Sequence, residues 1–139
     1  MSDAKPRQGT PAWFEMVGRL MRVAALQTPL SPDLNLSLVE RYTDGAEMPG
    51  GLVQGLRLDI RNGKPTFRVG ARHGERGDVT IEITAAAART LNRLRSDDPE
   101  FQATRDGILK SGEMRVDGDP AAIGSWLEMV HDPIVDRTL

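Results

Sequence analysis

The stretch GEMRVDGD, from Gly112 to Asp119, decides how the chain folds because it predicts a strand that runs directly into a helix. Met114 and Val116 alternate with charged residues, a pattern typical of a strand with one buried face. Asp119 can cap a helix whose first position is Pro120. Four apolar residues of that helix share one stripe, which must pack against another apolar surface: Ile123, Trp126, Leu127 and Val130.

Three further helices are predicted upstream by apolar residues at helical spacing. The first covers residues 11–27 and the second covers residues 85–95. The third begins at Ser96 or Asp97 and ends just before the strand. At the other end of the chain, the tail that follows the last helix is expected to turn at Pro133.

A hairpin is the clearest strand signal in the sequence. Asn62-Gly63 favours a type I′ turn, in which both central residues have positive φ. With these two residues as the loop, three apolar pairs face each other on one side of the sheet: Leu56 with Val69, Leu58 with Phe67, and Ile60 with Pro65. The register indicated by the turn therefore agrees with the register indicated by hydrophobicity.

The opposite face of this hairpin is rich in positive charge. It pairs Arg57 with Arg68, and two facing cations repel unless an acid or an anion lies between them. Asp59 is diagonal to Arg68 and is the acid expected to neutralise it. One interpretation of this face is a solvated surface, and the other is a site for an anionic partner at Arg57, Arg61, Arg68 and Arg72.

In two other segments apolar and polar residues alternate, which is typical of strands. Residues 79–83 form one of them, and residues 34–38 form the other. The alternation of the earlier segment fails at Val39 and Glu40, so we expect that strand to end or bulge there.

The order of these elements is helix, four strands, two helices, strand and helix. Strands in a block with helices segregated from them favour an α+β fold, with helices on one sheet face and solvent on the other. Residues 1–9 are polar and are expected to be disordered, and residues 10–139 are expected to form a single domain.

The composition excludes several classes of function. The chain of 139 residues has no cysteine and a net charge of −2, which argues against a disulfide framework, a thiolate metal site and a general nucleic-acid binder. We find no signal-peptide pattern and no apolar run of about 18 residues, the length that spans a membrane, so we expect a cytoplasmic protein. Phosphate-loop, zinc-peptidase and serine-hydrolase motifs are absent, and we expect no metal, no cofactor and no catalytic residue.

Element order and motifs resemble the sterol carrier protein 2 (SCP2) lipid-transfer family over about residues 10–130. Three motifs carry the resemblance: the Asn-Gly hairpin, the strand DVTIEI that starts at Asp78, and the Gly-x-Met-x-Val-x-Gly-Asp strand between two helices. The resemblance implies an SCP2-like α+β fold, with a five-stranded, mostly antiparallel sheet covered on one face by about four to five helices. Two departures from the family pattern, at 91–96 and after Val130, lie near the mouth of the family's ligand tunnel and bear on ligand identity.

The resemblance also implies a function, which is non-catalytic binding or transfer of a sterol, fatty acid or acyl-CoA in a tunnel between sheet and helices. Burial of apolar ligand surface would drive binding, at about 25 cal/mol per Å². Mapped onto this chain, the tunnel lining is Leu91, Leu94, Phe101, Ile108, Met114, Val116, Ile123, Trp126, Leu127 and Val130. The alternative interpretation is that these residues belong to the ordinary hydrophobic core and line no tunnel. A homodimer and a transient contact with a membrane surface also stay open.

Two other functions remain as alternatives. An enzyme on this fold would place a titratable residue of perturbed pKa in the cavity, and the candidates are Asp59, Glu82 and His131, although alternation puts both acids on the face away from the core. His131 and Asp132 can form an acid–base pair, but Asp132 precedes a proline and is better explained as a turn residue. A protein-interaction module would have a closed pocket and would dock its partner through the basic face or the terminal helix.

Overall fold

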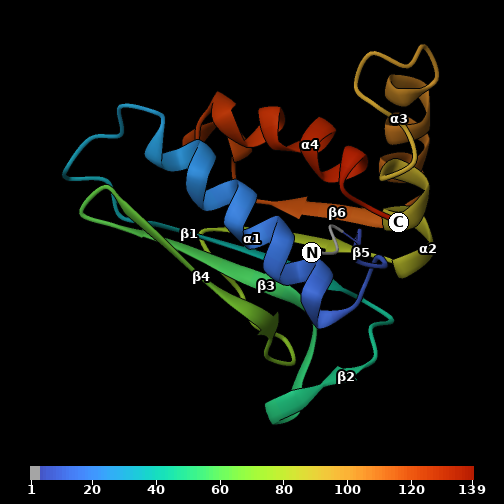
Figure 1. The fold of residues 1–139 in the computed structure, drawn as a ribbon, viewed down its shortest axis with the longest axis horizontal. Coiled ribbons are helices and arrows are strands. Elements are labelled where there is room, and N and C mark those ends of the chain that lie inside the picture. The colour runs from blue at the N-terminus through green and yellow to red at the C-terminus, as the bar shows by residue number, and fades with distance from the viewer. Residues whose placement is uncertain (1–3) are drawn as a thin grey trace.

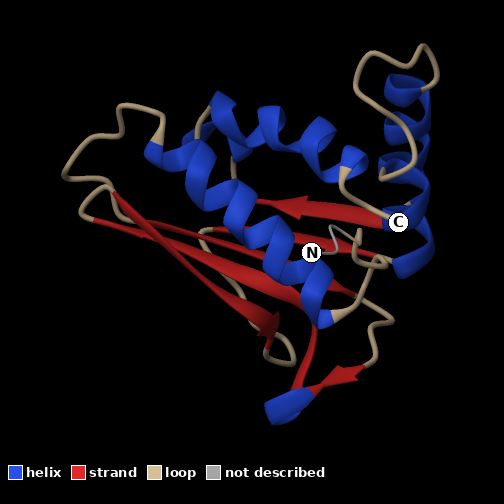
Figure 2. Cartoon of the chain, in the orientation of Figure 1, coloured by secondary structure: helices blue, strands red, loops and turns tan. Residues whose placement is uncertain are grey.

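The computed structural model of the protein describes residues 4–139, so the first three residues of the predicted tail lie outside the described residues. Helices cover one face of a six-stranded sheet, and within residues 4–139 the opposite face carries no helix (Figures 1 and 2). The α-helices are α1 (Pro11–Leu26), α2 (Ala85–Leu91), α3 (Phe101–Ser111) and α4 (His131–Asp136). Three short 3-10 segments are η1 (Pro49–Gly51), η2 (Pro120–Ala122) and η3 (Ser125–Val130).

The sheet confirms the predicted α+β class and its mostly antiparallel pairing. Its strands are β1 (Leu36–Tyr42), β2 (Glu47–Met48), β3 (Leu52–Arg61), β4 (Lys64–Ala71), β5 (Val79–Ile83) and β6 (Met114–Asp117). They lie in the order β2-β3-β1-β5-β6, with β4 paired to β3, and only β1 and β5 run parallel. The sheet has one strand more than expected because β2, with two residues, is too short to show an alternating pattern.

The predicted hairpin register between β3 and β4 is confirmed in all pairs from Leu56 to the turn, apolar and polar, and it shifts only between Val53 and Leu56. Asn62 and Gly63 both have positive φ, at 53° and 75°, as the type I′ turn requires. Leu56, Leu58 and Ile60 of β3 belong to the main core beneath the helices and are almost completely buried. This hairpin and β1 therefore provide a rigid floor for the helical layer.

Strand β1 corrects the expectation of a break at Val39 and Glu40, because it runs through both residues. Val39 is fully buried on the open face of the sheet, where it forms a small cluster with Val53 and Ala71. Glu40 lies on the helical face of β1, between the buried core residues Leu38 and Tyr42. Val39 is thus buried on one face while Leu38 is buried on the other, and this is why the alternation of apolar and polar residues fails here.

Helix α1 lies across the sheet and is held close to β4 (Figure 1). Its predicted N-cap is confirmed, since the Thr10 hydroxyl accepts a hydrogen bond from the Trp13 backbone N–H at 3.2 Å. Gly18 makes the close approach possible, because a Cβ there would lie 2.3 Å from the Phe67 ring on β4. The buried stripe of the helix faces the sheet and consists of Trp13, Phe14, Val17, Met21 and Ala25.

The helices in the second half are shorter than expected. Helix α2 ends at Leu91 instead of residue 95, and α3 begins at Phe101 instead of Ser96 or Asp97. Pro99 explains the later start, because the residue before a proline avoids the helical region. Residues 92–100 form a loop between the two helices.

The predicted terminal helix is wrong as a continuous helix, although its cap and its buried stripe are present. The Asp119 side chain accepts from the Ala121 backbone N–H at 3.0 Å, but the chain then forms η2 and η3 and becomes α-helical only in α4. Gly124 separates the two 3-10 segments with a φ of 124°, outside the helical region. Pro133 lies in the first turn of α4, where its missing N–H removes no hydrogen bond, so the expected turn there is also wrong.

Residues 6, 8 and 9, which precede α1, form hydrogen bonds with distant parts of the structure. The Pro6 carbonyl accepts from the Leu139 N–H at 3.0 Å, and the Gly9 carbonyl accepts from the Gln54 side chain at 2.8 Å. Gln8 donates to the Tyr42 hydroxyl at 3.1 Å. Pro6, near the start of the described residues, therefore lies beside the C-terminal Leu139.

Candidate functional site

A cavity of about 450 Å³ lies between the sheet and the helices. Strands β1, β5 and β6 form its floor, and α1, α2, α3, η3 and α4 contribute to its walls. Ligand cavities in proteins generally measure about 300–1,000 Å³ and are mostly apolar. This cavity has the size and the position expected for a ligand site.

The predicted lining residues divide into two groups. Six of the ten line the cavity: Leu91, Phe101, Met114, Val116, Leu127 and Val130. Ile108, Ile123 and Trp126 are instead buried in the surrounding core, and the Trp126 indole N–H donates to the Ile123 carbonyl at 3.0 Å. Leu94 is half-buried and does not reach the cavity.

Helix α1 contributes a wall that the sequence analysis did not assign to the cavity. Trp13, Phe14, Val17 and Met21 all line it. These residues belong to the stripe that predicted the helix, so the signal was present in the sequence. What the sequence did not show is that α1 faces the cavity as well as the sheet.

Glu40 is the second feature that the sequence analysis missed. It lines the cavity from the floor, on the same face of β1 as the buried Leu38 and Tyr42. Its register neighbours on the two adjacent strands are Leu56 and Ile81, so the surroundings of the carboxyl group are apolar. Burial raises the pKa of Glu40 from 4.5 to about 7.

Polar residues on the helical side form a rim around the cavity, defined here as Asn92, Ser96, Gln102, Arg105, Glu128 and His131. The His131 Nε2–H donates to the Leu94 carbonyl at 2.7 Å, and its ring packs on Phe101 with the centroids 4.7 Å apart. Asp132 accepts from the Ser96 backbone N–H at 2.7 Å and from its hydroxyl at 2.6 Å, which lowers the pKa of Asp132. Asp132 therefore fixes the loop before α3 and does not orient His131. It lies within α4, so its interpretation as a turn residue before Pro133 is wrong.

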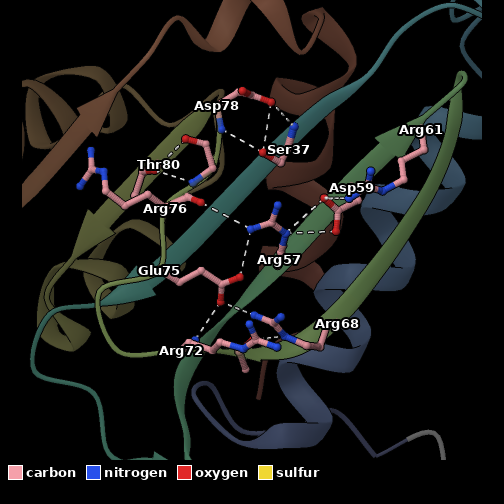
Figure 3. A network of polar contacts seen from close by, with 12 residues as sticks. Ser37, Arg57, Asp59, Arg61, Arg68, Arg72, Glu75, Arg76, Asp78 and Thr80 are labelled. Atoms are coloured by element: carbon pink, nitrogen blue, oxygen red, sulfur yellow. Dashed lines mark hydrogen bonds and ion pairs between the residues drawn. The ribbon is translucent and has the colours of Figure 1, made fainter.

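The open face of the sheet carries a network of ion pairs (Figure 3). Arg57 donates to Asp59 at 3.1 Å and to Glu75 at 3.0 Å, and Arg68 also pairs with Glu75. Asp59 thus neutralises Arg57 and not Arg68, which corrects the expected pairing. Glu75, from the loop after β4, lies between the two facing arginines. Although burial raises the pKa of Glu75, hydrogen bonds from the Arg72 backbone and from Arg68 hold it below its ordinary value.

This network limits the anionic-partner site expected on the same face. Arg57 and Arg68 are neutralised from within the protein, whereas the side chain of Arg61 is 76% exposed and Arg72 is also exposed. An anionic partner at this face stays a prediction. Glu82 also lies on the open face, where it forms an ion pair with Arg41 at 2.9 Å. It does not line the cavity.

The described residues contain neither a metal-binding cluster nor a membrane-spanning helix. Within residues 4–139 no group of three or more histidine, aspartate or glutamate side chains could hold a metal ion. In that same part of the chain, no helix combines the length and the apolar character needed to cross a membrane.

Comparison with known proteins gives similarity at the level of structure only. No protein-family model matches the chain, and no curated protein matches it in sequence. Solved structures that are similar include a UbiJ-SCP2 ubiquinone synthesis protein, with 16% identity and a TM-score of 0.48 over 93% of this chain and 96% of that one. A sterol carrier protein 2 structure gives 15% identity and a TM-score of 0.48 over 94% of this chain and 95% of that one.

A third similar structure is the stereoselective inverting sec-alkylsulfatase Pisa1 from Pseudomonas sp., with 20% identity and a TM-score of 0.38. The match covers 79% of this chain but only 13% of the alkylsulfatase. The matches to the two SCP2 structures extend along nearly the whole chain. With identities below 25% and TM-scores below 0.5, function has to be argued from the cavity itself.

Proposed function

We propose that the chain binds a hydrophobic small molecule, of the sterol, fatty acid or acyl-CoA type, in the cavity between sheet and helices without catalysing a reaction. The observation that carries this proposal is the cavity of about 450 Å³ with a mainly apolar lining. An empty apolar cavity of this size lowers the stability of a protein, and burial of an apolar ligand recovers about 25 cal/mol per Å².

The two alternative functions fit the structure less well. A protein-interaction module with a closed pocket would have a filled core, and the cavity argues against it. An enzyme would need a reactive group held in position by others. Glu40 lies in the cavity, but no side chain among the described residues forms a hydrogen bond with it, and the Nε2 of His131 is engaged with the Leu94 carbonyl. Ligand binding requires only the cavity, whereas catalysis would also require a positioned reactive group, so the structure fits binding without catalysis better.

A matched pair of substitutions tests the proposed site. Leu91 lines the cavity, whereas Leu94, three residues further on, is half-buried outside it. In Leu91→Trp the indole would occupy part of the cavity, and Leu94→Trp adds the same group elsewhere. Calorimetric titration with 1-dodecanol, dodecanoate and cholesterol compares the two variants with the unmodified protein, after circular dichroism has shown that both are folded.

We expect Leu91→Trp to weaken the binding of these probes at least about tenfold, which corresponds to about 1.4 kcal/mol, and Leu94→Trp to leave it unchanged. Equal affinities in both variants would place the binding site outside the cavity. If the unmodified protein binds none of the three probes, the proposed function is wrong.

A further inference from the structure

We propose that Glu40 is a polar anchor on the cavity floor that selects ligands whose polar end donates a hydrogen bond. Such ligands are apolar alcohols, phenols or amines, as opposed to molecules that end in a carboxylate. This inference rests on the proposed binding function and narrows its ligand class.

The position of Glu40 follows from the alternation of β1. Leu38 and Tyr42, two residues away on either side, are buried in the main core, while Val39 is buried in the separate cluster on the open face. The Glu40 side chain therefore projects from the same face as Leu38 and lines the cavity. On the adjacent strands it is flanked by Leu56 and Ile81, which offer no hydrogen bond.

No partner for the Glu40 carboxyl group exists among the described residues. Other acids in the sheet region behave differently, since Asp59, Glu75 and Glu82 each form an ion pair with an arginine on the open face. Glu40 is half-buried, and among the described residues only the Arg41 Nε is a fully buried side-chain atom without a hydrogen-bond partner, so the Glu40 carboxyl oxygens remain accessible from the cavity. A carboxyl group kept without a protein partner in a ligand-sized cavity is accounted for if the ligand supplies that partner.

The charges around the cavity favour a donor over a carboxylate at this position. Helix α1 lines the cavity with apolar residues only, and the other titratable or charged lining residues among those described are Tyr42, Arg105, Glu128 and His131. Burial raises the pKa of Tyr42 to about 12, so it is neutral at physiological pH. Arg105, Glu128 and His131 all belong to the rim. A ligand carboxylate placed beside Glu40 would meet a like charge with no cation on the floor to offset it.

Glu40 can form a hydrogen bond with a hydroxyl group in either protonation state. Ionised, it accepts from a hydroxyl or an ammonium group, and such charge-assisted hydrogen bonds are about twice as strong as neutral ones. Protonated, it donates to the oxygen of an alcohol. A fatty acid can still enter the cavity, but with its carboxylate at the rim, near Arg105.

The test uses four probes with the same alkyl chain, namely dodecylamine, 1-dodecanol, dodecanoate and dodecane, titrated into the delipidated full chain by calorimetry at pH 8. Glu40→Gln removes the charge with little change of shape, and Glu40→Met makes the floor apolar. Glu47→Gln, at an exposed position on β2 away from the cavity, is the matched control. Circular dichroism confirms the fold of each variant.

We expect the unmodified protein to bind dodecylamine and 1-dodecanol more tightly than dodecanoate. Glu40→Gln should weaken dodecylamine binding at least about tenfold and leave dodecane binding unchanged, and Glu40→Met should reduce the affinity for 1-dodecanol as well. Glu47→Gln should change none of the affinities.

Two results would overturn the inference. If dodecanoate binds most tightly, or if dodecylamine binds equally well with and without the Glu40 carboxyl group, then Glu40 is not the anchor, although the binding function stands. If no dodecyl probe binds the unmodified protein, the proposed function fails, and the anchor fails with it.

Discussion

Replacement of Glu40 by glutamine should make the ligand-free protein more stable at neutral and alkaline pH. Burial raises the pKa of the Glu40 carboxyl group from 4.5 to about 7 in the folded state. Between these two pH values the folded protein retains a proton that the unfolded chain has released. The free energy of unfolding therefore falls as the pH rises through this window.

The magnitude follows from the two pKa values. One unit of pKa corresponds to about 1.4 kcal/mol, so ionised Glu40 lowers the free energy of unfolding by about 3 kcal/mol once the pH exceeds 7. Below pH 4.5 the carboxyl group is protonated in both states and resembles an amide in shape and charge. Glu40→Gln should thus have nearly the same stability as the unmodified protein at pH 4.5 and be about 3 kcal/mol more stable at pH 8.

Urea unfolding of the delipidated protein, followed by circular dichroism, measures both stabilities at several pH values. Acids with lowered pKa, such as Glu75 and Asp132, change stability in the opposite sense but are present in both proteins, so the difference isolates Glu40. A difference that does not change between pH 4.5 and pH 8 would refute the reasoning, because it would mean that Glu40 titrates in the folded state as it does in the unfolded chain.

Three further substitutions test the parts of the structure that position the cavity. Glu75→Gln should lower the free energy of unfolding by about 1–3 kcal/mol at pH 7, since it leaves two facing arginines without their shared acid, and the loss should shrink at acid pH as Glu75 itself becomes protonated. Gly18→Ala should cost about 1–3 kcal/mol in urea unfolding, because its Cβ would lie 2.3 Å from the Phe67 ring and push α1 away from β4. Asp132→Asn should weaken the attachment of Ser96 to α4, and amide hydrogen exchange should then become faster in residues 92–100.

Controls for these substitutions come from positions without the same contacts. Gly107→Ala, in α3, meets nothing within 4 Å and should raise stability slightly, by about 0.5–1 kcal/mol. Equal effects of Gly18→Ala and Gly107→Ala would contradict the close packing of α1. No change of stability in Glu75→Gln would show that the two arginines do not depend on that acid, and unchanged exchange in Asp132→Asn would show that the loop is held by other contacts.

The hairpin and the sheet face that covers the core could be predicted from the sequence because the determining interactions are local. The Asn62-Gly63 turn sets the register, and alternation then assigns each side chain of β3 and β4 to a face. The terminal helix could not be predicted in the same way. Its apolar stripe is correct, but Gly124 adopts a positive φ that interrupts the helix, and helical periodicity does not reveal that interruption.

The cavity could be predicted only in part. Residues that follow a helical stripe or an alternating strand are identified as buried, but a pattern does not distinguish the cavity wall, as at Leu127, from solid core, as at Trp126. Glu40 was missed for a related reason. A charged residue in an apolar row predicts the end of a strand, whereas in the three-dimensional structure β1 continues and carries the Glu40 carboxyl group on its helical face.

Native mass spectrometry of the protein as purified from cells, followed by organic extraction, tests the central claim most directly. The account predicts a non-covalent adduct of lipid or sterol size that is present in the unmodified protein and in Leu94→Trp but is lost or strongly reduced in Leu91→Trp. A bare protein mass in all three samples, unchanged after incubation with 1-dodecanol or cholesterol, would contradict the claim that this cavity binds a hydrophobic ligand.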